Sequence, residues 1–157
     1  MLDRGEIDGF IAPRPPACAG RNPNVGWLFA NPTAAAKDYY KRTGIYPIMH
    51  LVGVRRSLAE SHPWLPAAVF KAFDRAKAAA VAKLADTSAT KVTLPFVEEQ
   101  LKAAQELLGP DQWSYGGAAN RKTLEAFVRR HHADGLSARR LGVDELFHPS
   151  TLETAKI

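Results

Sequence analysis

The other predicted elements of this chain are arranged around one stretch, residues 40–56. It reads YKRTGIYPIMHLVGVRR, and between positions 48 and 54 its apolar residues occupy both alternating faces. A strand that is apolar on both faces is typical of a sheet with helices above and below it. The pattern therefore predicts an interior strand of an α/β layer. One ionisable residue, His50, interrupts this strand, shortly after a glycine and a proline that could form a hinge.

Helical spacing and capping signals predict about five helices around this strand. Asn31 and Pro32 open the first helix and Gly44 ends it, and a capping box at Ser57 opens a short second one. A longer helix follows over residues 66–85, with its apolar stripe at Val69, Phe73, Ala76, Ala80 and Leu84. Two more are expected, from Pro95 to Gly109 and from Asn120 to near Gly135, and residues 1–6 read as a last helical turn ended by Gly5.

The predicted strands are too few to close a sheet. Besides residues 48–54, only 7–12 and the brief apolar piece 25–29 are candidates, and a stable sheet needs neighbours on both sides of each interior strand. Two interpretations remain open at this point. The chain is either a small helical domain with a minor sheet or a piece of a larger α/β protein.

Composition narrows the class of partner. The formal charge of the 157 residues is +5, but the basic residues are dispersed in pairs, and no aromatic-interleaved basic ribbon indicates nucleic-acid binding. Small anions fit better, because one or two arginines suffice to hold them. No apolar run approaches the ~18 residues of a membrane helix, and the lone Cys18 excludes a disulfide within the chain.

Only a few side chains are candidates for binding a ligand or for catalysis. Arg14 follows a strand candidate in a proline-rich loop, where an anion could bind, although a plain surface arginine explains it equally well. Trp113 and Tyr115 flank Ser114 in a glycine-containing loop that could contact a flat ligand or simply pack the edge of the core. His50 could take part in catalysis, or it could be a buried neutral histidine that hydrogen-bonds to the backbone. Metal-ligand spacings are absent, so the sequence gives no positive support for a metal.

Several segments resemble one family. The segments GEIDGFIAPRPP, NPNVGWLF, PIMH, HPWLPAAVFKAF, DTSATKVTLP, WSYG and LFHPST are similar to the C-terminal half of the 4,5-dihydroxyphthalate decarboxylases, along nearly the whole chain. More distantly, the order of elements is similar to type II periplasmic solute-binding proteins, whose two lobes close over a ligand. The resemblance implies a partial, helix-rich version of that α/β fold with an incomplete sheet. Residues 1–43 would then be the end of the second lobe and the crossing segment, and residues 44–157 the C-terminal part of the first lobe.

The reaction implied by this resemblance is loss of carbon dioxide from 4,5-dihydroxyphthalate, which leaves protocatechuate and requires no redox cofactor. From position and chemistry we assign His50 as the acid that protonates the ring, and Arg14 as the clamp on the retained carboxylate. Tyr46, Trp113 and Tyr115 are the expected ring contacts. The expected partner is a small aromatic dicarboxylate, with neither nucleic acid nor membrane, and a homo-oligomer is left open.

Two other functions compete with this one. The chain could be a non-catalytic module that binds small anions, or an inactive fragment whose sheet lacks its partners. Because the predicted sheet is incomplete, we expect the isolated chain not to turn over substrate even if the decarboxylase assignment is correct. The cytoplasm is the expected location of an enzyme that degrades aromatic compounds.

Overall fold

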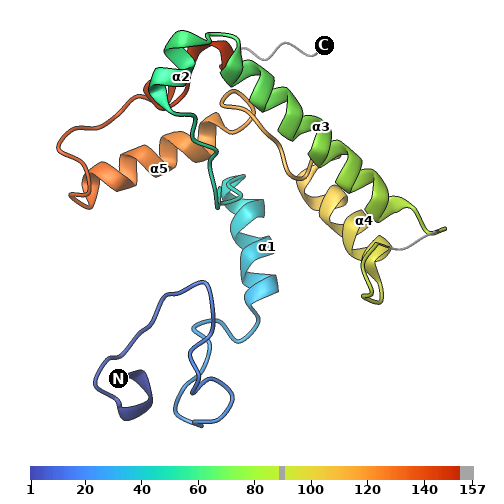
Figure 1. The fold of residues 1–157 in the computed structure, drawn as a ribbon. Helices are drawn as coiled ribbons and strands as arrows, with labels where there is room; N and C mark the ends of the chain where they lie inside the picture. Colours follow the sequence, from blue (N-terminus) through green and yellow to red (C-terminus); the bar gives the residue numbers. More distant parts are fainter. Residues whose placement is uncertain (89–90, 153–157) are drawn as a thin grey trace. The chain divides into compact units, whose positions relative to one another are not determined.

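Helices are the regular elements of this chain in the computed structural model, which describes residues 1–88 and 91–152 (Figure 1). The chain divides into two compact units, Met1–Thr43 and Gly44–Ile157. The predicted helix-rich character is confirmed. No helix in the described ranges combines the length and apolar character needed to cross a membrane. The elements in chain order are η1 (Leu2–Arg4), α1 (Pro32–Thr43), α2 (Arg56–Ser61), α3 (Leu65–Ala85), α4 (Val97–Leu108), α5 (Arg121–Ala133), η2 (Val143–Leu146) and η3 (Pro149–Thr151).

The first unit combines a long irregular loop with helix α1. The loop returns to the start of the chain, where the side-chain amide of Asn22 donates to the backbone carbonyl and the carboxylate of Asp3, at 3.0 and 2.9 Å. Helix α1 has the predicted bounds, because Asn31 Oδ1 accepts the backbone N–H of Ala34 at 2.9 Å and Gly44 adopts φ 62° after the last turn. The predicted capping signals of this helix are confirmed.

The structure corrects the strand predictions. Residues 7–12, 25–29 and 48–54 have no strand pairing anywhere in the described part of the chain. The physical reason is that a strand is stable only as part of a ladder, and these segments find no partner strand among the described residues. Residues 48–54 instead run as an irregular connection from Gly44 to α2, with most of their side chains exposed.

Helices α3 and α4 form the main helical pair of the second unit. They pack against each other and run in opposite directions, as Figure 1 shows in green and yellow. The buried stripe of α3 differs from the prediction, since Phe73 is 47% exposed while Lys77 is turned inward. Ala89 and Thr90, which fall between these two helices in the sequence, lie outside the described residues.

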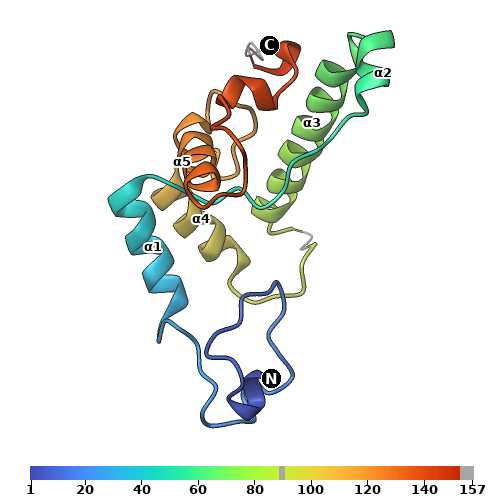
Figure 2. The same cartoon turned by 90° about the vertical axis from the view of Figure 1, so that its left-hand side faces the viewer.

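The buried core of the second unit lies on helix α5. Leu124 and Val128 of α5 pack with Val143 of η2, and Phe147 covers this small cluster. Figure 2 shows α5 in orange beside the red C-terminal turns that contribute these residues. The core is small for a unit of this length, and many large apolar side chains remain on its surface.

The starts of helices α2 and α5 differ in detail from the predicted ones. Helix α2 begins at Arg56, one residue before the predicted capping box, and Ser57 accepts a hydrogen bond from Ser61 through its carbonyl instead of capping the helix. Asn120 precedes α5 as predicted, but its side chain does not cap that helix. Its amide is used in the neighbouring loop, as described below.

Candidate functional site

The aromatic cluster is the name we give to the three predicted ring-contact residues, Tyr46, Trp113 and Tyr115, of which the first two are in contact within the second unit. The rings of Tyr46 and Trp113 meet edge to face, with centroids 5.8 Å apart and an interplanar angle of 66°. This geometry is a favoured one for two aromatic rings. Tyr46 comes from the segment before α2, whereas the other two residues come from the loop after α4. Residues distant in sequence therefore contribute to one cluster.

Lys77 of α3 extends this cluster, and the sequence analysis missed it. Its Nζ lies 4.7 Å from the centre of the Tyr115 ring and pairs with Asp111 at 3.0 Å and Asp74 at 3.2 Å. The side chain is only 13% exposed. A lysine three residues after an aspartate on a helix is a visible signal, but the contact with Asp111 joins residues 34 positions apart and has no local signature.

Asn120 holds the loop that carries Trp113 and Tyr115. Its Nδ2 donates to the carbonyl oxygens of Ser114 and Gly116, both at 3.0 Å, and its Oδ1 lies 3.2 Å from Ser114 Oγ. An asparagine side chain has both donors and an acceptor, so it can satisfy several loop groups at once. The orientation of the aromatic residues is thus set by Asn120 as well as by their own packing.

His50 and Arg14 are placed in different units. His50 is exposed in the irregular segment four residues after Tyr46, and no hydrogen bond or ion pair joins it to another described residue. Arg14 is exposed in the loop of the first unit, between Pro13 and Pro15 as the sequence indicated. Each is accessible to a ligand within its own unit. Their roles in acid catalysis and carboxylate binding remain predictions.

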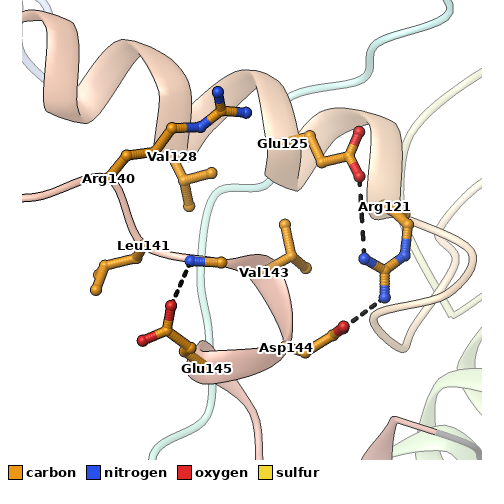
Figure 3. A pocket seen from close by; sticks show the side chains of 9 residues that line it. Arg121, Glu125, Val128, Arg140, Leu141, Val143, Asp144 and Glu145 are labelled. Carbon is orange, nitrogen blue, oxygen red and sulfur yellow. Dashed lines mark hydrogen bonds and ion pairs between the residues drawn. The ribbon is translucent and has the colours of Figure 1, made fainter.

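A pocket of about 280 Å³ lies where helix α5 meets η2 (Figure 3). Figure 3 shows Arg121 between Glu125 and Asp144, with which it forms ion pairs. Glu145 accepts the backbone N–H of Gly142 at 2.7 Å and is also held by Arg139. The hydrogen bonds from Arg139 and then from Gly142 lower the pKa of Glu145 to about 2. The carboxylates of Glu125, Asp144 and Glu145 are already paired with arginines. The pocket therefore holds α5 and η2 together, and its described lining residues offer no free carboxylate for catalysis.

A second pocket, of about 400 Å³, contains an arginine and a histidine that the sequence analysis did not select. It is lined by Arg56, Ala59, Glu60, Pro63 and His148, at helix α2 and the start of η3. Nδ1 of His148 lies 2.8 Å from Ser150 Oγ and accepts the backbone N–H of Ser150 at 3.3 Å. In the neutral imidazole, Nε2 then carries the proton. Arginine and histidine are the residue types expected for a carboxylate clamp and an acid. His148 of this pocket is therefore the second candidate for the acid, beside His50.

The described residues contain no candidate metal centre. Within that part of the chain, no three or more histidine, cysteine, aspartate or glutamate side chains are grouped so that they could hold a metal ion. The two carboxylates nearest to the aromatic cluster, those of Asp74 and Asp111, are paired with Lys77.

Comparison with known proteins confirms the resemblance seen in the sequence segments. The whole chain is 55% identical to a curated 4,5-dihydroxyphthalate decarboxylase from Comamonas testosteroni, over 158 residues. The match covers 48% of that relative and falls in its C-terminal part, so the chain spans about half of its length. A 4,5-dihydroxyphthalate decarboxylase from Pseudomonas putida is 43% identical over 42 residues, which are 26% of this chain and 16% of that protein. No protein-family model matches the chain.

Proposed function

We propose that this chain supplies the C-terminal part of a carboxy-lyase that converts 4,5-dihydroxyphthalate to protocatechuate and carbon dioxide. The observation that carries the proposal is the 55% identity along the whole chain to the Comamonas relative of that name. Such identity over a full alignment supports a shared fold and a shared chemistry. The proposal extends to a small aromatic dicarboxylate as substrate and to the cytoplasm as the site of the reaction.

The chemistry needs a proton donor and an anchor for the substrate. Each ring hydroxyl of the substrate is para to one carboxyl-bearing carbon, so it can supply electron density when that carbon is protonated. The bond from this carbon to its carboxylate then breaks, carbon dioxide leaves, and the bonding electrons restore the aromatic ring. The product retains both hydroxyls and one carboxylate, so no oxidant or reductant is consumed.

The residues that we assign to these tasks are those selected from the sequence. His50 protonates the ring carbon, because an imidazolium side chain can donate a proton, and Arg14 holds the retained carboxylate through paired hydrogen bonds. The aromatic cluster contacts the ring of the substrate. The edge-to-face contact between Tyr46 and Trp113 supports this last role, since it places two aromatic rings from separate segments of one unit beside each other.

The fold that we propose for the complete enzyme is the bilobal type II periplasmic-binding-protein arrangement. Residues 1–43 would end the second lobe and residues 44–157 would complete the first. The exposed apolar segment 48–54 supports this proposal, because it has the composition of an interior strand and no partner strand among the described residues. The polypeptide that completes the sheet would correspond to the part of the Comamonas relative that this chain does not match.

A chimaera tests the proposed function. The matched part of the Comamonas relative is replaced by this chain, and the purified chimaera is incubated with 4,5-dihydroxyphthalate while protocatechuate is quantified. We expect product formation by the chimaera and none by the isolated 157-residue chain. A chimaera that unfolds as cooperatively as the intact relative yet forms no product contradicts the proposal. Thermal stabilisation by the substrate without turnover would indicate an anion-binding module instead.

A further inference from the structure

Residues 48–54 form an exposed apolar segment whose backbone is open for pairing. Met49, Leu51 and Val52 are 71%, 64% and 60% exposed. No backbone or side-chain hydrogen bond joins residues 46–54 to another described residue. Water can hydrogen-bond to the exposed backbone groups, but a run of large apolar side chains in water is unfavourable and marks a surface that other polypeptide covers.

The sequence of this segment lacks the features that protect an exposed strand edge. Natural edge strands carry charged residues, prolines or bulges that prevent pairing with another chain. Between Ile48 and Val54 there is no lysine, arginine, aspartate, glutamate or proline. Apolar residues occupy both alternating faces, which is the pattern of a strand covered on both sides. The segment is therefore suited to be covered by other polypeptide and not to remain in water.

The comparison with the Comamonas relative indicates what covers it. Only 48% of that protein is matched by this chain, so a comparable length of polypeptide lies outside the match. We propose that residues 48–54 pair as a β-strand with the polypeptide corresponding to that unmatched part, and that this pairing is the main contact that completes the decarboxylase. The inference rests on the proposed function, and it names the surface through which the chain joins its partner.

Strand pairing would also fix the position of His50. In an extended strand, alternate side chains point to opposite faces, so His50 shares a face with Ile48, Val52 and Val54. Met49 and Leu51 occupy the other face. Pairing thus converts His50 from an exposed side chain on an irregular segment into one held on a defined face of a sheet. The same event that completes the fold positions the proposed acid.

Backbone amide exchange over residues 48–54 tests this inference. We expect rapid exchange in the isolated chain and protection increased by at least about 100-fold in the chimaera with the Comamonas relative, as for amides in a core strand. Leu51→Lys should reduce this protection, because it places a charge on a covered face. Leu136→Lys is the matched control, since Leu136 is 69% exposed and lies outside the segment.

The outcomes separate this inference from the proposed function. Unprotected amides over 48–54 in a folded chimaera overturn the strand pairing, even if protocatechuate is formed. Protection without turnover supports the pairing and rejects the function. Concentration-dependent protection in the isolated chain, together with dimer formation, would show that a second copy is the occupant and would also overturn the inference. If the chimaera does not fold, the aligned segment of the intact relative is measured, and rapid exchange there overturns the inference.

Discussion

Lys77 lies over the ring of Tyr115 and forms ion pairs with Asp74 and Asp111. Burial alone would lower its pKa, but the hydrogen bonds from its ammonium to Asp111 and Asp74 outweigh burial and raise the pKa above its ordinary value of 10.5. A raised pKa means that the folded state favours the protonated form. The resulting stabilisation is fully present below pH 10.5 and is lost as the pH rises through the higher pKa of the folded state.

Replacement of Lys77 by methionine tests this arrangement. Lys77→Met should lower the free energy of unfolding at pH 7 by about 1 kcal/mol, because it removes two charged contacts while keeping a similar apolar stem. The difference in the free energy of unfolding between this variant and the wild-type chain should become smaller above pH 10.5, where the lysine of the unfolded chain loses its charge. Urea denaturation between pH 7 and pH 12 measures both effects. Lys102→Met is the control on the exposed side of α4, and an equal loss in that variant would contradict the assignment.

Glu145 provides the opposite pH dependence. Its pKa is lowered from 4.5 to about 2 by Arg139 and Gly142, so its stabilising effect is complete above pH 4.5 and is lost as the pH falls towards 2. We expect Glu145→Gln to be less stable than the wild-type chain at pH 7. The difference in the free energy of unfolding between the two proteins should disappear as the pH falls from 4.5 to about 2. Denaturant unfolding of both proteins across this range measures the difference. A difference that is independent of pH, or the same behaviour in Glu106→Gln, would be inconsistent with this account.

His50 and His148 offer a direct comparison of two candidate acids. If His50 protonates the ring, His50→Gln in the chimaera should lower the turnover number by about 10²- to 10⁴-fold. His148→Gln should leave turnover nearly unchanged, although it removes a histidine from the pocket beside Arg56. Steady-state rates with 4,5-dihydroxyphthalate, together with melting temperatures of both variants, give the answer. A large loss of turnover in His148→Gln and little loss in His50→Gln would instead identify His148 as the acid.

At the scale of elements, helices were predictable and strands were not. Asn31, Pro32 and Gly44 carry the local signals of a helix start and end, and α1 has those bounds because its capping contacts lie within a few residues. Residues 48–54 have the composition of a strand, but pairing depends on a partner that is distant or on another polypeptide. The side of α3 that faces inward was also misplaced, because the contact of Lys77 with Asp111 is not visible in the helix itself.

The two asparagines beside helices have different tasks and give a paired prediction. Asn31→Ala should destabilise the start of α1 by about 1 kcal/mol, as loss of a cap does, and speed amide exchange over residues 33–36. Asn120→Ala should instead speed exchange over residues 113–117, because two loop carbonyls lose their donor, at a cost of about 1–2 kcal/mol. Exchange measured by mass spectrometry on both variants makes each the control for the other. Increased exchange at the start of α5, with an unchanged loop, would contradict the role of Asn120.

At the scale of the whole molecule, contacts between distant segments could not be predicted from the sequence. Tyr46 and Trp113 were selected separately as candidate ring contacts, and the structure shows that their rings meet edge to face. His50 and Arg14 lie in separate units, and their convergence on one substrate is part of the proposal. The boundary between the units falls at Thr43 and Gly44, and its identity as a lobe crossing is part of the proposal.

The most direct measurement is the yield of carbon dioxide and protocatechuate from 4,5-dihydroxyphthalate by the chimaera that carries this chain. The account predicts that both products form in equimolar amounts, at a rate within about tenfold of the intact Comamonas relative, a difference of about 1.4 kcal/mol in activation free energy. A chimaera that folds cooperatively and leaves the substrate unchanged, while the intact relative consumes it under the same conditions, would contradict the central claim.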